Sequence, residues 1–414
     1  MAADKQNKVL NVPTLRFPEF TDKWKECELQ DVASISKGAG ISKDQLSDTG
    51  EPCILYGELY TKYKSEVITD VLSKTNIDTA NLVRSKANDV IIPSSGETAI
   101  DISTARCVPF DNILLGGDLN ILRLREQDGR FFSYQLNGVR KLDIAQIAQG
   151  VSVVHLYGES LKRLIVRYPS RSEQQKISSL LASIDERITT QIRIIAQLKS
   201  LIIGLNNYLM DNPSWENVRV GDFMDFYSTN SLSWEQLDYK PGEVKNLHYG
   251  LIHSGLPTLI DCHLCSLPNI KDEFLPKQYT LCEDGDVAFA DASEDTNEVG
   301  KAVEIIDCRK QSIVCGLHTI HGRDKANATI VGFKGFAFNA KYFHDQLRRI
   351  SQGSKIYSIS TDNIKSCFLR IPPKSEQEKI VRLLSTYLQK IDVAEQTLKA
   401  YQIQKQYLLK TLFI

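Results

Sequence analysis

The most regular pattern of apolar positions runs over residues 172–209, where apolar side chains recur every three or four residues. This is the spacing of one face of an α-helix. Residues 375–412 have the same spacing, and each stretch has one polar interruption, Gln191 or Lys405. Patterns of this length are typical of a coiled-coil seam. The predicted seam positions are Ile177, Leu181, Ile184, Ile188, Ile195, Leu198, Ile202, Leu205, Ile380, Leu384, Ile391, Leu398, Tyr401, Leu408 and Leu412.

The rest of the chain has shorter strand-like runs, such as 90–93, 112–115 and 119–124, separated by turns rich in Gly, Asp and Ser. Runs of this length, bounded by turn residues, predict strands. Residues 215–373 show a similar alternation of short runs and turn residues. We therefore expect an α+β fold in the region before each predicted long helix.

The chain contains an internal duplication. The sequence SEQQKI at 172–177 is repeated as SEQEKI at 375–380, an offset of 203 residues. Upstream, the offset drifts from 191 near Trp24 to 199 at Gly117, which we match with Gly316. The drift indicates that the two globular parts differ in loop length, whereas the helices keep their register.

We therefore expect two α+β globular domains related by duplication and separated by two long helices, each about 57 Å long. If a pseudo-twofold axis crosses the helices, they form an antiparallel coiled coil. The expected parts are an N-terminal segment (1–24), a first domain (25–170), a first spacer helix (171–212), a second domain (213–374) and a second spacer helix (375–414).

The composition limits the classes of protein to which the chain can belong. A chain of 414 residues with 42% hydrophobic residues has enough apolar surface for several cores, which excludes intrinsic disorder and a disulfide-stapled miniprotein. The 50 basic and 51 acidic residues give no whole-molecule attraction to nucleic acid or to a membrane. Nine cysteines without a regular framework, a start without signal-peptide features, and no apolar run of about 20 residues favour a cytoplasmic protein that spans no membrane.

Several motifs resemble those of a known family, the specificity subunits of Type I restriction-modification systems. They are PTLRFPEF at 13–20, YGELYT at 56–61, SSGET at 94–98, GGD at 116–118 and the two SEQ(Q/E)KI helix starts. The resemblance covers nearly the whole chain. The second half departs from it where Asp291-Ala-Ser-Glu294 replaces the SSGE of the first half.

The resemblance implies a DNA-binding subunit that recognises a bipartite, asymmetric double-stranded target, one part for each target recognition domain. Two modification subunits would methylate adenine at N6, and two restriction subunits would supply ATP-dependent cleavage. S-adenosylmethionine, ATP and Mg²⁺ are expected on those partners. The chain itself would need no cofactor and catalyse nothing, and it contains neither an Asn-Pro-Pro-Tyr motif nor a P-loop.

Candidate DNA contacts combine aromatic, hydroxyl and basic side chains, a mixture that can contact phosphates, sugars and base edges. Phosphate contact by Lys62 or Lys64 is a simpler expectation than base reading, and ordinary turn or capping roles remain open for the serines and threonines. The predicted contacts are Lys37, Lys43, Tyr56, Tyr60, Thr61, Lys62, Tyr63, Lys64, Ser94, Ser95, Glu97, Thr98, Tyr227, Asn230, Ser231, Tyr249, His253, Ser254 and Lys355.

A metal site is a further hypothesis, because Cys262 and Cys265 form a CxxC pair. The downstream candidates are Cys308, Cys315, His318 and His321. The sequence has no second CxxC pair, so we favour reduced core cysteines and expect no metal.

Two other functions compete with DNA recognition. The helices alone would also suit a coiled-coil scaffold that does not recognise DNA. However, the two duplicated domains differ in their loops, which favours recognition of DNA sequence. A hydrolase is disfavoured, because no nucleophile elbow is present.

Overall fold

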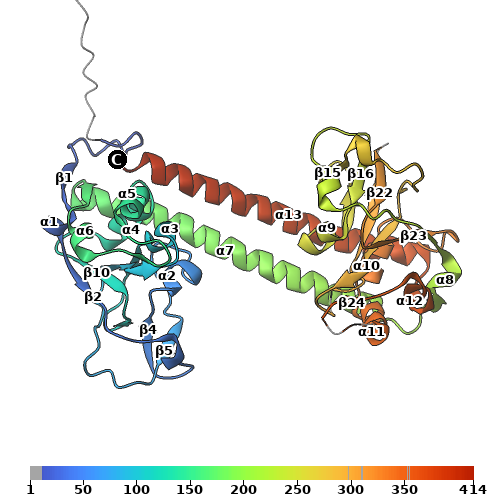
Figure 1. The fold of residues 1–414 in the computed structure, drawn as a ribbon, viewed down its shortest axis with the longest axis horizontal. Coiled ribbons are helices and arrows are strands. Elements are labelled where there is room, and N and C mark those ends of the chain that lie inside the picture. Colours follow the sequence, from blue (N-terminus) through green and yellow to red (C-terminus); the bar gives the residue numbers. More distant parts are fainter. Residues whose placement is uncertain (1–11, 297, 309–310, 352, 354) are drawn as a thin grey trace, which may run out of the picture. The chain divides into compact units, whose positions relative to one another are not determined.

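The computed structural model describes residues 12–296, 298–308, 311–351, 353 and 355–414. It divides into two compact units: unit 1 comprises Met1–Arg193 with Glu395–Ile414, and unit 2 comprises Ile194–Ala394. Two long helices, α7 (Arg171–Met210) and α13 (Lys374–Thr411), each contribute one end to each unit (Figure 1).

Unit 1 is built around an antiparallel sheet of four strands. Their order is β2 (Ala33–Lys37), β10 (Leu119–Leu124), β6 (Asp89–Pro93) and β8 (Arg106–Val108). Side chains alternate between the two faces of a strand. Val90 and Ile92 therefore enter a core shared with α4 (Gly129–Asn137) and the start of α7, whereas Ile91 enters a separate core. This double burial explains the continuous apolar run at 90–92.

A second sheet and two short strand pairs complete unit 1. The sheet has the order β3 (Leu46–Ser47), β5 (Ser73–Thr75), β4 (Glu51–Ile54), β9 (Leu114–Leu115), and only β4 and β9 pair in parallel. The pairs are β1 (Lys25–Glu28) with β12 (Ile165–Tyr168) and β7 (Ser95–Gly96) with β11 (Val154–His155). The short helices are α1 (Leu29–Val32), the 3-10 turn η1 (Lys43–Gln45), α2 (Glu58–Thr61), α3 (Ala99–Ile102), α5 (Lys141–Ile147) and α6 (Gly158–Lys162).

Unit 2 repeats this plan with one added strand, β17. Its larger sheet has the order β14 (Met224–Tyr227), β23 (Thr319–Asp324), β19 (Val287–Ala290), β21 (Ala302–Asp307), β17 (Leu259–Asp261). The second sheet has the order β15 (Leu237–Asp238), β18 (Asn269–Ile270), β16 (Val244–Leu247), β22 (Ser312–Cys315). The remaining elements are β13 (Glu216–Arg219) with β25 (Phe368–Ile371), β20 (Ala292–Ser293) with β24 (Tyr357–Ser358), α8 (Val220–Phe223), η2 (Trp234–Gln236), α9 (Tyr249–Ser254), η3 (Asp272–Phe274), α10 (Phe333–Phe338), α11 (Lys341–Ile350) and α12 (Thr361–Ser366).

Hydrogen bonds fix the register of the duplication. The Gly116 amide donates to the carbonyl of Ile54 at 2.9 Å, and the Gly316 amide donates to that of Leu247 at 2.9 Å. Gly316 therefore corresponds to Gly116, one residue before the match expected from the sequence. His318 (φ 52°) then occupies the left-handed turn position that Asp118 (φ 56°) occupies in unit 1.

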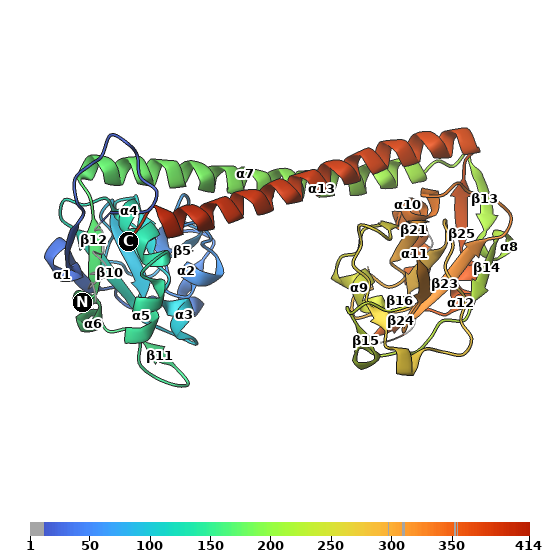
Figure 2. The same ribbon diagram turned by 90° about the horizontal axis from the view of Figure 1, so that it is seen from above.

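The ends of the long helices pack within each unit. In unit 1, Ile177 and Leu181 of α7 share a core with Leu408 and Leu412 of α13. Figures 1 and 2 show the end of α13 beside the start of α7 in this unit. Unit 2 combines the opposite ends, and its core includes Ile380 and Leu384. This combination of ends is the one that an antiparallel pair requires. Every predicted seam position is at least partly buried.

Among the described residues, α7 alone is long and apolar enough to cross a membrane by length and composition. The sequence expectation had excluded such a helix. Only 6% of the most apolar 18-residue stretch of α7 is buried, whereas Ile177, Leu181 and Ile184 near its start lie in the core of unit 1.

Candidate nucleic-acid interface

A hollow of about 760 Å³ opens in unit 1 between η1, the turn from β4 into α2, and the turn before β10. Four predicted contact residues line it: Lys43, Tyr56, Thr61 and Lys62. Asp118, which the sequence analysis placed only within the GGD motif, also lines the hollow. Residues from three separate segments thus lie around one concave surface.

Lys62 lies beside a buried carboxylate. Its ammonium group donates to Glu58 Oε1 at 2.6 Å and to Ser73 Oγ at 3.1 Å, and its side chain is 46% exposed. A phosphate would have to compete with Glu58 for this charge. Thr61 donates to the carbonyl of Gly57 at 2.7 Å, and Lys64 donates to that of Thr61 at 2.9 Å. Lys43 is exposed.

Tyr63 belongs to the core rather than to the surface. Its side chain packs in the cluster between the two sheets, its hydroxyl accepts a hydrogen bond from the Leu72 amide at 3.2 Å, and burial raises its pKa to about 12. Tyr56 and Tyr60 are partly buried, and burial together with neighbouring Tyr56 raises the pKa of Tyr60. We therefore leave Tyr63 out of the contact surface.

The Ser94–Thr98 segment serves mainly as a turn and a cap. Ser94 and Ser95 are buried. Thr98 accepts a hydrogen bond from the Asp101 amide at 3.1 Å and so caps α3. Only Glu97 and Thr98 of the predicted contacts in this segment are exposed.

Two further predicted lysines lie at other places. Lys37 is exposed at the end of β2 and lines a smaller hollow of about 270 Å³ in unit 1 together with Tyr157 and Lys162. Lys355 is exposed before β24 in unit 2.

Unit 2 has an aromatic and histidine cluster where unit 1 has its hollow. The register of β4 and β16 places Tyr249 at the position of Tyr56, and the ring of Tyr249 lies 4.8 Å from His248, 5.9 Å from His253 and 5.1 Å from His318. Trp234 of η2 lies 4.4 Å from His248 and is 46% exposed. Sequence reasoning did not include Trp234, His248 or His318 among the DNA contacts, although the offset of 191 already matches Trp234 with Lys43.

Tyr227 and Asn230, two further predicted contacts of unit 2, have structural partners. The Tyr227 ring lies 5.2 Å from that of His321 and 5.0 Å from the Arg323 guanidinium. Asn230 donates to the carbonyl of Cys315 from its amide at 3.3 Å and from Nδ2 at 3.1 Å. Ser231 and Ser254 are exposed.

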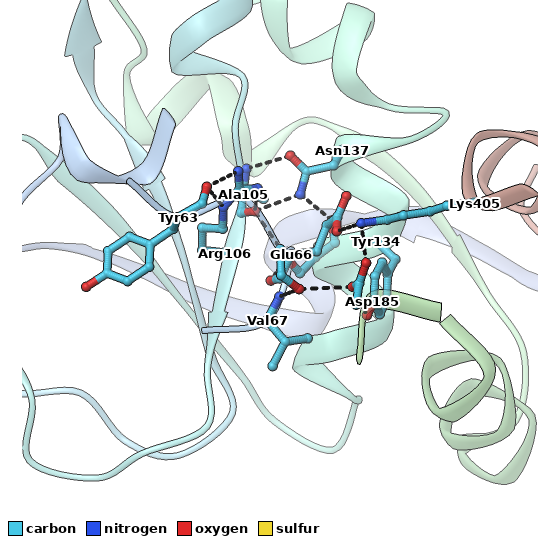
Figure 3. Close-up of polar contacts among 11 residues, drawn as sticks. Tyr63, Glu66, Val67, Ala105, Arg106, Tyr134, Asn137, Asp185 and Lys405 are labelled. Carbon is cyan, nitrogen blue, oxygen red and sulfur yellow. Dashed lines mark hydrogen bonds and ion pairs between the residues drawn. The ribbon is translucent and has the colours of Figure 1, made fainter. Parts of the chain in front are cut away.

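A buried ionic network holds the chain just after α2 in unit 1 (Figure 3). The ammonium of Lys405 on α13 contacts Glu66 and lies 2.6 Å from Asp185 on α7. Asp185 also accepts hydrogen bonds from Tyr134 at 2.7 Å and from Ser65 at 2.9 Å. Burial opposes the charge on Lys405, but the two carboxylates outweigh it, so the pKa of Lys405 is raised.

Arg106 extends this network toward the hollow. Its guanidinium donates to the carbonyl of Tyr63 at 2.9 Å, and Ser133 donates to that of Glu66 at 2.7 Å (Figure 3). Burial lowers the pKa of Arg106. The segment after Lys62 is therefore fixed to α4, α7 and α13, which positions the lining residues that precede it.

Comparisons with known proteins decide the family. The family model of the Type I restriction modification DNA specificity domain matches the chain twice, over residues 21–200 and 212–401. The chain belongs to this family. The Type I restriction-modification S subunit from M. genitalium has a similar fold, with a TM-score of 0.60, 16% identity, and coverage of 97% of this chain and 99% of that one. A second similar structure is described as showing complex assembly and conformational transition of the type I R-M system. It has a TM-score of 0.60 and 14% sequence identity, and the match covers 94% of this chain and 97% of that one.

Family membership confirms the expected fold class, with duplicated α+β domains and long helices. It identifies the chain as a DNA specificity component of Type I restriction-modification complexes, which act on DNA together with partner subunits. The individual DNA contacts remain predictions.

Proposed function

We propose that the chain recognises a bipartite, asymmetric double-stranded DNA target, with one half-site read by each globular domain. The observation that carries this proposal is that equivalent positions in the two units hold side chains of different chemical character. In unit 1 the hollow presents Lys43 and Asp118, whereas the corresponding place in unit 2 presents Trp234 and His318. Two domains with the same fold and different surface side chains are suited to binding two different DNA sequences.

The chemistry of the two surfaces supports different half-sites. Lys43 offers only hydrogen-bond donors and Asp118 offers acceptors, so together they can contact phosphates and base edges of opposite polarity. The cluster of Trp234, Tyr249 and His318 offers apolar ring faces and imidazole groups. Such rings favour contacts with thymine methyl groups and sugars.

In this proposal the chain is not catalytic and acts in the cytoplasm. It directs adenine N6 methylation by two modification subunits and ATP-dependent cleavage by two restriction subunits, and these partners hold S-adenosylmethionine, ATP and Mg²⁺. The near-neutral charge of the chain supports this division, because strong phosphate attraction needs an excess of basic residues. We expect the partners to supply part of that charge.

The long helices are the proposed docking elements. On α7, Ile192, Leu201, Ile203 and Tyr208 are exposed, at 49–80% of their surface. Exposed apolar side chains clustered on one element are typical of protein–protein contact sites. A scaffold without DNA readout would share this feature, so the helices do not separate the two functions.

Domain exchange separates them. Replacing residues 25–150 by the same region of a family member with a different target should change one half-site of the methylated sequence and leave the other intact. The reciprocal exchange of residues 216–352 is the matched control and should change only the other half-site. A change in both half-sites after either exchange would contradict independent readers, and an unchanged target after both would favour the scaffold.

A further inference from the structure

Two thiols and an imidazole meet inside unit 2. Cys282 precedes β19, Cys315 ends β22 and His321 lies in β23, and all three are buried. Their ligand atoms lie within 4.8 Å of one another, and the two sulfurs are 3.7 Å apart. Because β22 and β23 belong to different sheets, this cluster lies at the joint between the two sheets of the unit.

We propose that Cys282, Cys315 and His321 bind a divalent transition-metal ion of the zinc class. Two sulfurs held at about 2.3 Å by a tetrahedral ion lie about 3.8 Å apart, which agrees with the separation seen here. A linear two-coordinate ion would need about 4.6 Å, twice that bond length. The separation therefore favours tetrahedral coordination.

His321 supplies the second, independent observation. Its Nε2 lies 2.7 Å from Asp286 Oδ2, and its Nδ1 is buried with no hydrogen-bond partner among the described residues. The carboxylate can only accept, so Nε2 carries the proton and Nδ1 keeps a lone pair that is free to bind a metal ion. A carboxylate on the outer nitrogen is the usual support of a metal-bound histidine.

The duplication shows that the fold does not need these ligands. In the register of the two units, Ser85, Leu115 and Ile121 occupy the places of Cys282, Cys315 and His321. The ion pair of Asp89 with Arg123 forms in unit 1 without a histidine, just as Asp286 pairs with Arg323 in unit 2. A buried histidine with an unused nitrogen is costly, and a bound ion would use that nitrogen.

The ion would also be balanced in charge. Cysteine binds a metal ion as the thiolate, so each of the two thiols gives up its proton on binding. Binding a divalent ion displaces two protons and leaves a neutral complex with two thiolates. Cys308, whose thiol donates to the Cys282 carbonyl at 3.5 Å, places a further sulfur near the trio.

The site lies beneath the predicted contact surface of unit 2. Asn230 is bonded to the Cys315 carbonyl, and the Tyr227 ring packs against His321. The ion would therefore hold the two sheets together where these predicted contact residues attach. The equivalent positions of unit 1 hold no metal ligands, so only unit 2 would be stabilised by a metal ion in this way.

Cobalt titration of the full chain tests the proposal. Chain purified under reducing conditions and freed of metal by a chelator should bind one equivalent of Co²⁺, with the thiolate charge-transfer band and the visible bands of a tetrahedral site, and Zn²⁺ should abolish both. The triple variant Cys282→Ser, Cys315→Leu, His321→Ile, which installs the unit 1 residues, should lose the bands. Cys282→Ser alone gives the same test should the triple variant fail to fold.

The CxxC pair provides the matched control. Cys262→Ser with Cys265→Ser should keep the cobalt spectrum. The proposal is overturned by the absence of thiolate–cobalt bands, by bands that survive in Cys282→Ser but vanish in the CxxC variant, or by a Cys282–Cys315 disulfide in the chain as purified.

Discussion

Replacement of Lys405 by Met removes the ammonium group that contacts two buried carboxylates. Glu66 and Asp185 would then share a site with like charges and lose their ammonium partner, while the methionine roughly keeps the volume of the lysine stem. Breaking a buried ion pair by removing one partner costs about 3–5 kcal/mol. We expect unit 1 to lose stability in that range, a fall in its melting temperature of about 6–20 °C at roughly 2–4 °C per kcal/mol.

The second unit shows which substitutions should restore that stability. At the helix positions related by the 203-residue offset, unit 2 has Ile202 in place of Lys405 and Leu388 in place of Asp185, and both pack against its apolar core. Combining Lys405→Ile and Asp185→Leu with Glu66→Met removes all three charges. Apolar replacement of buried ionic groups is often neutral or stabilising, but the buried Tyr134 hydroxyl loses its Asp185 acceptor, so the triple variant should recover part of the loss.

The contribution of Lys405 to the stability of unit 1 is fully present at neutral pH. The pKa of Lys405 is raised above 10.5, so its contribution is complete below that value and is lost only as the pH rises through the folded pKa. Measurements near pH 7 therefore contain the full effect.

Fluorescence of Trp24 follows unit 1 alone when the other two tryptophans, Trp215 and Trp234, are replaced by phenylalanine. Urea denaturation in this background gives the free energy of unfolding for Lys405→Met and for the exposed control Lys410→Met, which should stay within about 0.5 kcal/mol of the parent. A loss below about 1 kcal/mol for Lys405→Met, or a triple variant no more stable than the single one, would refute the reasoning.

Three further outcomes are expected. Lys43→Ala should weaken binding of the assembled complex to its target and reduce the slope of log K against log salt by about 0.9, measured by fluorescence anisotropy; an unchanged slope would exclude a phosphate contact. Deleting one heptad from each long helix should shorten the gap between half-sites or abolish methylation, whereas an unaltered target would contradict a role of the helices in spacing. Burial lowers the pKa of His248 and of His344, so their contribution is complete above pH 6.5 and is lost as the pH falls. In a Trp24→Phe variant, the urea midpoint of unit 2 should therefore fall between pH 7.5 and 5.5 by more than that of unit 1, and equal shifts would contradict this assignment.

The long helices were predictable because their pattern repeats over many turns and recurs in the second half of the chain. The sequence also singled out Lys405 as a polar interruption of the seam. Its partner Glu66 could not be recognised, because 339 residues separate the two and only the folded unit brings them together.

The site was harder to predict because short elements carry little periodicity. Tyr60 and Tyr63 stand three residues apart in a tyrosine-rich segment, yet Tyr60 is partly exposed and Tyr63 is buried between the two sheets. Ser94 and Ser95 read as a polar turn, but pairing of β7 with β11 buries both. Cys282 escaped the metal hypothesis because it lies outside the CxxC spacing, 33 residues from Cys315.

The central claim is that this chain selects a split DNA sequence for its partner subunits. The most direct test is methylome sequencing of cells that express the modification subunits with this chain and of cells that lack only this chain. Our account predicts a two-part, asymmetric motif carrying N6-methyladenine that is present in the first cells and absent from the second. With the complex shown to assemble, identical methylomes in the two cells would contradict it.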